Sequence, residues 1–260
     1  MLKANFHTHT FRCKHAEGSE REYVEEAIKS GIKTLGFSDH TPYFFDKGYV
    51  SNDKMLPSEL EGYVKTVNDL KKEYKGDIDI YLGLETEYYP KHFEQLIRFI
   101  EPFQIEYMIL GQHHTNNEYD GVYAFTKNHT EADFITYVNQ VIAGINTGYF
   151  SYVAHPDVFY FPPKTEVYQK NMEKLCMVAK EKGLPLEFNL SGFMSGHWYP
   201  ERKFLEIAKD VGNEIIFGVD AHQKHAFMRA QNIMDSAEKL VEEIGLKITD
   251  KIKLLDGRTV

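Results

Sequence analysis

The chain has 260 residues, of which 42% are hydrophobic and 14% aromatic, and its formal net charge at pH 7 is −9. This length suits one α/β barrel, and the acidic balance lacks the basic face that a nucleic-acid partner requires. No apolar stretch approaches the roughly 18–20 residues of a membrane span, and residues 1–6 lead into the first strand without room for a signal peptide. We therefore expect a cytoplasmic protein with no membrane partner.

Short apolar runs alternate with helix-like segments along the whole chain. The runs that we predict as strands are Leu2–Thr8, Thr34–Asp39, Ile78–Glu87, Tyr107–His114, Tyr152–His155, Pro185–Leu190 and Ile215–Asp220. Seven closely spaced β-then-α units predict one α/β domain over residues 1–260, a parallel (β/α)7 barrel similar to a TIM barrel but lacking one strand. An open doubly wound sheet is the alternative, but such a sheet places its ligands around one switch point.

Capping signals and loop composition define the segments between the strands. Ser19-Glu20-Arg21-Glu22 is a capping box that opens a helix ending near Ser30, and Thr130-Glu131-Ala132-Asp133 caps another helix. We expect Thr41–Leu56, rich in Tyr, Phe and Gly, to be the longest loop after an early strand. The C-terminal segment Ile248–Val260 should form a small strand or a docked tail.

Metal-ligating side chains recur at the carboxyl ends of the strands, where parallel barrels carry their active sites. Side chains two residues apart on a strand share a face, so His7 with His9, and Asp220 with His222, each offer two ligands together. The strand ends between them carry His40, Glu85, His114, His155, Glu187 and Asn189. Imidazole and carboxylate together suit Zn, Mn or Fe. The sequence therefore predicts a polynuclear metal centre on the rim of the barrel.

The two cysteines, Cys13 and Cys176, stand in no paired spacing, which indicates neither a disulfide framework nor a zinc ribbon. Cys13 lies close to His9 and His15 in the sequence and could contact a metal ion, but we expect it to be a neutral loop cysteine. A ligand set without thiolates suits a reversible, catalytic metal site more than a closed structural one.

The ordered set of motifs resembles the polymerase-and-histidinol-phosphatase (PHP) family from residue 5 to about residue 230. The motifs that carry the resemblance are His7-Thr8-His9, the outlying His15, Ser38-Asp39-His40, Gly83-Leu84-Glu85, Ala154-His155-Pro156, Glu187-Phe188-Asn189 and Gly218-Val219-Asp220-Ala221-His222. His-x-His alone is a weak signal, whereas the ordered set is specific. The length and the segment Leu186–Gly192 look most like the stand-alone histidinol-phosphate phosphatases, bacterial-type enzymes of histidine biosynthesis.

This resemblance implies a distorted seven-stranded barrel that binds two or three divalent metal ions (Zn, Mn or Fe). Carried over by position, the ligands would be His7, His9, Glu85 and Asp220 for the first ion, Glu85, His114 and His155 for the second, and His15, His40 and His222 for the third. The family pattern Gly-x-x-His, aligned on Gly111, selects His114 as a ligand. The neighbouring His113 stays open as the alternative.

The resemblance also implies hydrolysis of a small phosphorylated substrate, L-histidinol phosphate, to L-histidinol and phosphate. A carboxylate shared by two cations, here Glu85, brings them to about 3.5–4 Å apart, where a bridging water becomes a hydroxide near neutral pH. Attack of that hydroxide on phosphorus expels the alcohol. Asp220 is the candidate for moving the proton, and a purely ligating role is its alternative.

The residues expected to bind the substrate depart from the family pattern. Family phosphatases commonly have an arginine soon after the Asn-x-Ser-Gly element, but here no arginine follows before Arg202. We expect His197, Arg202 and the third metal ion to share the phosphate contacts, although Arg202 could simply begin a helix in solvent. Ser191 could donate a further hydrogen bond or could be structural. Phe44, in the first long loop, could stack on an imidazole ring or could pack a lid.

Three other functions stay open at this point. An amidohydrolase barrel also begins with His-x-His, but Glu85 on the third strand, together with the third-ion set His15, His40 and His222, favours phosphoester chemistry. A PHP-family phosphodiesterase or nucleotidase is compatible with the acidic charge if its substrate is small. A non-catalytic metal-binding module is disfavoured, because every ligand position that the family implies carries a plausible residue.

Overall fold

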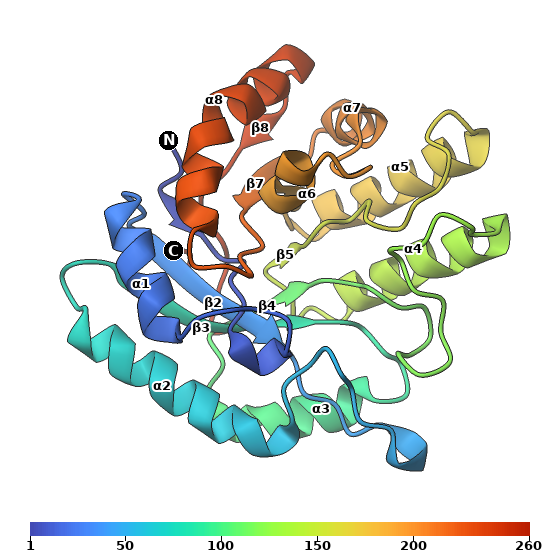
Figure 1. The fold of residues 1–260 in the computed structure, drawn as a ribbon. Helices are drawn as coiled ribbons and strands as arrows, with labels where there is room; N and C mark the ends of the chain where they lie inside the picture. The colour runs from blue at the N-terminus through green and yellow to red at the C-terminus, as the bar shows by residue number, and fades with distance from the viewer.

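The computed structural model describes residues 1–260, and its centre is one curled sheet of eight parallel strands (Figure 1). In their order across the sheet, the strands are β1 (Ala4–Asn5), β2 (Thr34–His40), β3 (Asp79–Thr86), β4 (Tyr107–Leu110), β5 (Tyr152–Val153), β6 (Leu186–Asn189), β7 (Glu214–Gly218) and β8 (Lys247–Ile248). The predicted α/β barrel-like architecture is confirmed, and each predicted run overlaps a strand. The predicted count of seven is wrong, because the two exposed residues of β8 pair with β7 and form no apolar run that the sequence could reveal.

The segments that follow β1 and β7 pair with each other at the carboxyl end of the sheet. The backbone N–H of His9 donates to the carbonyl of Ala221 at 3.0 Å, and the N–H of Ala221 donates to the carbonyl of His7 at 3.1 Å. These two bonds join segments more than 200 residues apart. They place the His7–His9 pair directly beside the Asp220–His222 pair, which is the arrangement that the metal-centre prediction requires.

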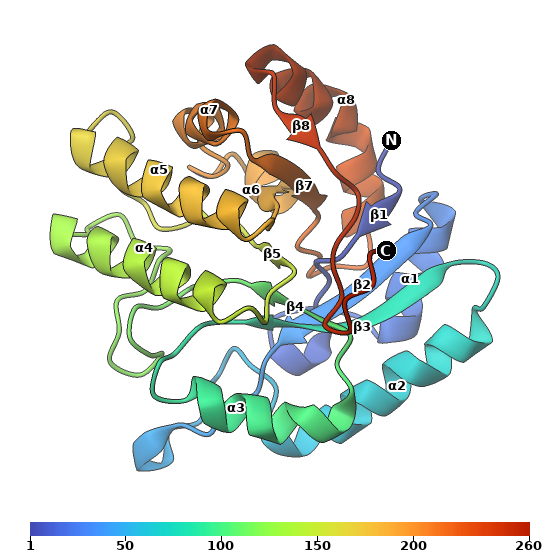
Figure 2. The same ribbon diagram turned by 180° about the vertical axis from the view of Figure 1, so that it is seen from behind.

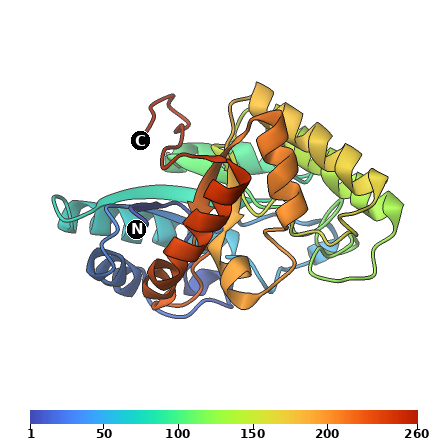
Figure 3. The ribbon, with the colours of Figure 1, turned by 90° about the horizontal axis from the view of Figure 1, so that it is seen from above.

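Helices surround the curled sheet on its outer side (Figures 1 and 2). They are α1 (Glu20–Lys29), α2 (Leu60–Glu73), α3 (Phe93–Ile100), α4 (Glu131–Asn146), α5 (Glu166–Glu181), α6 (Leu190–Ser195), α7 (Arg202–Val211) and α8 (Ala226–Ile244). Helices α4 and α5 lie side by side (Figure 3), and α5 also packs against α7. The capping boxes predicted at Ser19 and Thr130 are both present. No helix is long and apolar enough to cross a membrane.

A small apolar cluster fills the inside of the curl below the rim. The hydroxyl of Tyr107 donates to the carbonyls of Phe6 and Phe37 at 2.9 Å each, which satisfies its polar end. The C-terminal tail packs against the same cluster, since Ile252 and Leu254 are buried there. The amino end of the sheet is therefore sealed by apolar side chains, and the polar side chains gather at the carboxyl end.

Two long loops overhang that carboxyl end. One is Thr41–Leu56, as predicted, and it contains a 3₁₀ turn at Asp46–Gly48. The other connects β4 to α4 over residues 111–130 and is longer, which corrects the predicted strand Tyr107–His114. The strand ends at Leu110, and the chain then turns so that the backbone N–H groups of His113 and His114 donate to the carboxylate of Glu87. We call residues 115–129 the flap.

Candidate metal centre

The carboxylate of Glu85, at the end of β3, lies at the centre of the rim and is almost fully buried. Five histidine nitrogens surround its two oxygens, at 2.9 Å (His40 Nδ1 and His155 Nε2), 3.4 Å (His9 Nε2) and 3.6 Å (His7 Nε2 and His113 Nε2). Gly111 makes this position possible, because a Cβ there would lie 1.8 Å from Glu85 Oε1. The geometry makes Glu85 the shared carboxylate of the cluster.

Asp220, which follows β7, is the second carboxylate of the rim. Its Oδ1 lies 3.2 Å from His9 Nε2, 3.5 Å from His7 Nε2 and 3.2 Å from His222 Nδ1. His222 in turn places its Nε2 3.0 Å from the Nε2 of His15. Asp220 therefore joins the His-x-His pair of the first strand to a second group of imidazoles.

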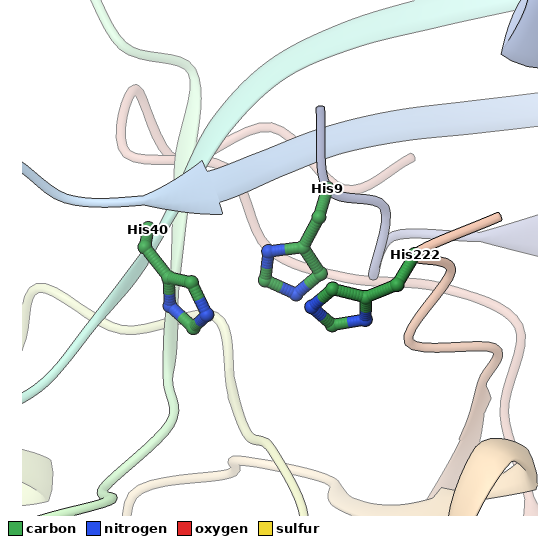
Figure 4. Close-up of side chains that lie close together, drawn as sticks. All are labelled: His9, His40 and His222. Carbon is green, nitrogen blue, oxygen red and sulfur yellow. The ribbon is translucent and has the colours of Figure 1, made fainter. Parts of the chain in front are cut away.

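The rings of His9, His40 and His222 converge on one space from three separate segments (Figure 4). His9 and His222 stack at 4.0 Å between ring centroids, and His15 lies 4.7 Å from His222 and 5.4 Å from His40. The fold thus brings together the three histidines that the resemblance assigned to a third ion.

Buried carboxylates also hold the far sides of the imidazoles. His7 Nδ1 lies 2.7 Å from Glu187 Oε1, so its Nε2 is left to face the cluster. Glu187 is itself held by the backbone N–H of His155 at 2.8 Å and by the side-chain amide of Asn189 at 3.0 Å. A carboxylate that accepts from the remote N–H of a histidine is typical of metal-ligating imidazoles, because it fixes the tautomer and the ring orientation.

The two rim carboxylates are ionised. Burial raises the pKa of Glu85, but the neighbouring imidazoles of His40, His113 and His7 outweigh burial and hold this pKa well below its usual range. Burial likewise raises the pKa of Asp220, and neighbouring histidines reverse that effect. Each carboxylate therefore keeps its negative charge at neutral pH, among the imidazoles that surround it.

The histidines divide into two groups by the direction in which their pKa is shifted. Burial lowers the pKa of His40 and of His113, and burial with the neighbouring imidazole of His222 lowers the pKa of His15 to about 4, which favours rings that keep a free lone pair. Burial also lowers the pKa of His9, but the carboxylates of Asp220 and Asp39 beside its ring outweigh burial and raise that pKa to about 9. The same competition between burial and nearby carboxylates raises the pKa of His7 and His155.

Several polar atoms of the cluster are buried without any hydrogen-bond partner. They are His7 Nε2, both ring nitrogens of His9, Glu85 Oε2 and His155 Nδ1. Buried polar atoms are nearly always paired, and the unpaired Nε2 atoms of His7 and His9 both lie within 3.6 Å of Glu85 and of Asp220, which indicates a group that is bound between them. Nitrogen and carboxylate donors fit Zn, Mn or Fe. The residues present therefore fit divalent metal ions.

Cys13 lies beside this cluster. Its sulfur is within 4.8 Å of ligand atoms of His15 and His222, and also of His9 and Asp39. The side chain is fully buried, and burial raises the pKa of the thiol. This environment favours the neutral cysteine that we expected over a thiolate ligand.

His113 and His114 face different carboxylates. His113 turns its Nε2 toward Glu85, whereas His114 has its Nδ1 3.7 Å from Glu87 Oε2 and stacks on Tyr123 at 4.8 Å between ring centroids. Glu87 accepts the backbone N–H of both histidines at 2.8 Å each, which fixes the turn. The geometry does not support the choice of His114 and favours the alternative, His113.

Of the four predicted substrate contacts, only Ser191 lines the cavity above the cluster. Arg202 begins α7 with its side chain 55% exposed and pairs with Glu206, which corrects its expected phosphate contact and matches the alternative of a solvated helix start. His197 is exposed and stacks on Tyr199. Phe44 is the second correction, because it packs edge-on against Phe99 at 4.8 Å, away from the cavity.

The cavity above the cluster has a volume of about 400 Å³ and is lined by residues that the sequence analysis missed. They are Asp53, Lys54, Tyr123, Phe125 and Tyr199. Four of the five come from the two long loops, where no hydrophobic periodicity marks which side chains turn inward. Lys54 is buried with its Nζ 2.7 Å from Glu87 and 3.2 Å from Glu118, so its charge is already balanced inside the protein.

Comparisons with known proteins agree with the motifs and the fold. The family model described as PHP domain matches residues 5–191. A histidinol-phosphatase of Bacillus subtilis (strain 168) is 28% identical over 253 residues, which are 86% of this chain and 94% of that protein. A probable histidinol-phosphatase of Deinococcus radiodurans is 27% identical over 266 residues, at 98% and 94% coverage.

Among solved structures, the fold is similar to that of histidinol phosphate phosphatase from Lactococcus lactis subsp. lactis Il1403, complexed with zinc, L-histidinol and phosphate. The TM-score is 0.75, with 22% sequence identity and 96% of each chain covered. The two chains therefore share one fold over almost their whole lengths.

Proposed function

The chain belongs to the PHP domain family, and from this premise we propose that it is a metal-dependent phosphomonoesterase acting on L-histidinol phosphate. Hydrolysis to L-histidinol and phosphate would serve histidine biosynthesis in the cytoplasm. The observation that carries the proposal is the buried carboxylate of Glu85, surrounded by five histidine nitrogens at the base of an open cavity. Relatives that match over most of their length and are named histidinol-phosphatases support the substrate.

The rim residues would hold two or three divalent ions, with zinc, manganese and iron all compatible with the donor set. The proposed ligand sets are His7, His9, Glu85 and Asp220 for one ion, Glu85, His113 and His155 for another, and His15, His40 and His222 for a third. Bound divalent cations would supply Lewis-acid charge, which lowers the pKa of water and offsets the charge on the phosphoryl group.

The protein's own contribution to the reaction is to hold groups and to move a proton. Glu187 fixes His7, and the Glu87 carboxylate fixes the turn that carries His113. In hydrolysis the oxygen of water attacks phosphorus, the P–O bond to the alcohol breaks, and the departing oxygen takes a proton. Asp220 is our candidate for transferring that proton, and the exposure of its side chain supports this role, since it is 13% exposed whereas that of Glu85 is 1% exposed.

Replacement of Asp220 by Asn should lower kcat by at least about 10²-fold, the scale of general acid–base catalysis, while most of the metal stays bound. The amide keeps the size and one oxygen ligand but cannot accept and release the proton. Activity and metal content per chain should be measured on the same preparations, with Asp210→Asn on exposed α7 as the control. A loss of activity in proportion to lost metal would leave Asp220 as a ligand only.

The two adjacent histidines of the turn give a matched pair of variants. His113→Ala should weaken metal binding and lower kcat/KM by at least about tenfold. Loss of a residue that only hydrogen-bonds to a metal ligand already has effects on that scale, and loss of a ligand itself should have a larger one. His114→Ala should have a smaller effect, since this ring faces Glu87 and Tyr123. The reverse order, measured by metal titration and phosphate release, would restore His114 as the ligand.

The proposed substrate is tested by phosphate release from L-histidinol phosphate, with p-nitrophenyl phosphate as the reference ester. The metal-loaded protein should reach a kcat/KM of about 10⁴ M⁻¹s⁻¹ or more on L-histidinol phosphate, well above the reference. Weak and equal hydrolysis of both esters would contradict the assignment to histidine biosynthesis. Phosphodiesters and mononucleotides would then be the next substrates to assay.

A further inference from the structure

The mouth of the cavity carries a carboxylate and an aromatic ring that phosphate hydrolysis does not use. Asp53 reaches the cavity from the Thr41–Leu56 loop, and Tyr123 reaches it from the flap. Asp53 is exposed, and it lies close enough for its charge to act on Tyr123 and on His15. Two loops that are far apart in the sequence therefore line one opening.

The negative charge of Asp53 has no cationic partner. Its neighbour Lys54 is the only lysine or arginine that lines the cavity, and it is 4% exposed between Glu87 and Glu118. Arg202 is occupied on the outer surface by Glu206. Metal ions held by the rim below would attract a phosphate group, so a free carboxylate at the opening fits a ligand whose other end is positive.

The flap presents Tyr123 as a supported aromatic surface. Its ring is 44% exposed, stacks on His114, and lies 5.4 Å from Phe125, which itself lies 5.9 Å from His113. The flap is tied back by an N–H of Ala124 that donates to the carbonyl of His113 at 2.7 Å. A flat ring that enters the cavity could stack on Tyr123 with little loss of conformational entropy, because the contacts with His114 and Phe125 already order the tyrosine side chain.

We propose that Asp53 and Tyr123 form a subsite for the cationic, aromatic half of the substrate. An ammonium group would bind Asp53, and a heteroaromatic ring would lie against Tyr123, with the phosphate directed to the rim. The proposal rests on the proposed phosphatase function and defines its substrate class, which is phosphomonoesters of amino alcohols that carry a flat ring. Esters with further negative charge, such as nucleotides, are disfavoured by Asp53.

The test compares two esters that differ in one group: L-histidinol phosphate and 3-(imidazol-4-yl)propyl phosphate, which lacks the amino group. Asp53→Asn should lower the ratio of their kcat/KM values by at least about tenfold, the scale of one charge-assisted hydrogen bond. Asp46→Asn, an exposed change in the same loop and outside the cavity, should leave the ratio unchanged. Tyr123→Leu should instead lower kcat/KM for both imidazole esters more than for O-phosphoethanolamine.

A binding measurement separates this subsite from the chemistry. L-Histidinol, which has no phosphate, should bind the metal-stripped protein with a Kd that rises at least about fivefold in Asp53→Asn and not in Asp46→Asn, as measured by calorimetry. An unchanged Kd together with an unchanged substrate ratio would overturn the subsite. If the wild-type protein hydrolyses all esters equally but still binds L-histidinol through Asp53, the proposed function fails and the subsite stands.

Discussion

Removal of divalent metal should abolish hydrolysis of L-histidinol phosphate, with a loss of at least about 10³-fold, while the chain stays folded. The large loss is expected because bound metal ions would lower the pKa of the attacking water and would offset the negative charge on the phosphoryl oxygens. The fold should persist because its main apolar core lies between the sheet and the helices, away from the rim. Phosphate release and the circular dichroism spectrum, measured before and after chelation, check both parts.

Reactivation of the stripped protein should depend on pH. Without cations, the rim carboxylates raise the pKa of His9 to about 9 and also raise the pKa of His7 and His155, so bound metal must displace protons. Added zinc or manganese should therefore restore activity at lower concentrations near about pH 8 than near about pH 6.

Full activity in excess chelator would contradict the metal requirement. Loss of the circular dichroism signal would instead indicate a structural metal.

Replacement of Glu85 by Gln should lower kcat/KM by at least about 10³-fold, the largest effect expected of any single substitution, because it disables the site that metal catalysis needs. The amide has the same size but carries no charge, and its NH₂ group would face imidazole nitrogens that now face a carboxylate. The protein should also bind less metal. Activity and metal content per chain are the quantities to measure.

Glu214→Gln provides the matched control, since Glu214 is an exposed glutamate that begins β7 at the opposite end of the same sheet. This variant should keep wild-type metal content and activity. A Glu85→Gln protein with full metal content and activity within about tenfold of wild type would contradict a shared carboxylate at the centre of the site.

The strand-end ligands could be predicted because strand geometry and barrel topology together determine where their side chains point. His7 and His9 lie two residues apart in one extended segment and so share a face, and the carboxyl ends of parallel strands meet at one rim, so their convergence with Asp220 follows from local pattern and topology. His15 was found only through the resemblance, since it lies in a loop after a 3₁₀ turn. The eighth strand was missed because Lys247–Ile248 is short and exposed.

The choice between His113 and His114 could not be made from the sequence. Strand β4 ends at Leu110, and beyond it successive side chains no longer point to opposite faces of the sheet. The sequence pattern therefore cannot show which of the two adjacent histidines faces the metal centre. The turn is fixed instead by Glu87, which accepts both backbone N–H groups from another strand. That long-range contact leaves no trace in the local sequence.

The substrate side of the site was predicted least well. Arg202 and Phe44 were chosen for their chemistry near recognisable motifs, but each packs on the outer surface. Asp53 and Tyr123 come from loops whose course depends on tertiary contacts, so neither periodicity nor capping indicates which side chains face the cavity. Local sequence pattern thus locates metal ligands at strand ends, but it does not locate substrate contacts on loops.

The most direct test of the metal centre is anomalous X-ray diffraction from crystals of the protein grown with zinc. We expect at least two zinc peaks in contact with the oxygens of Glu85, about 3.5–4 Å apart, with His113 and His155 among the ligands. Zinc found only at exposed histidines such as His225, with none at Glu85, would contradict the shared-carboxylate centre on which the proposed phosphatase rests.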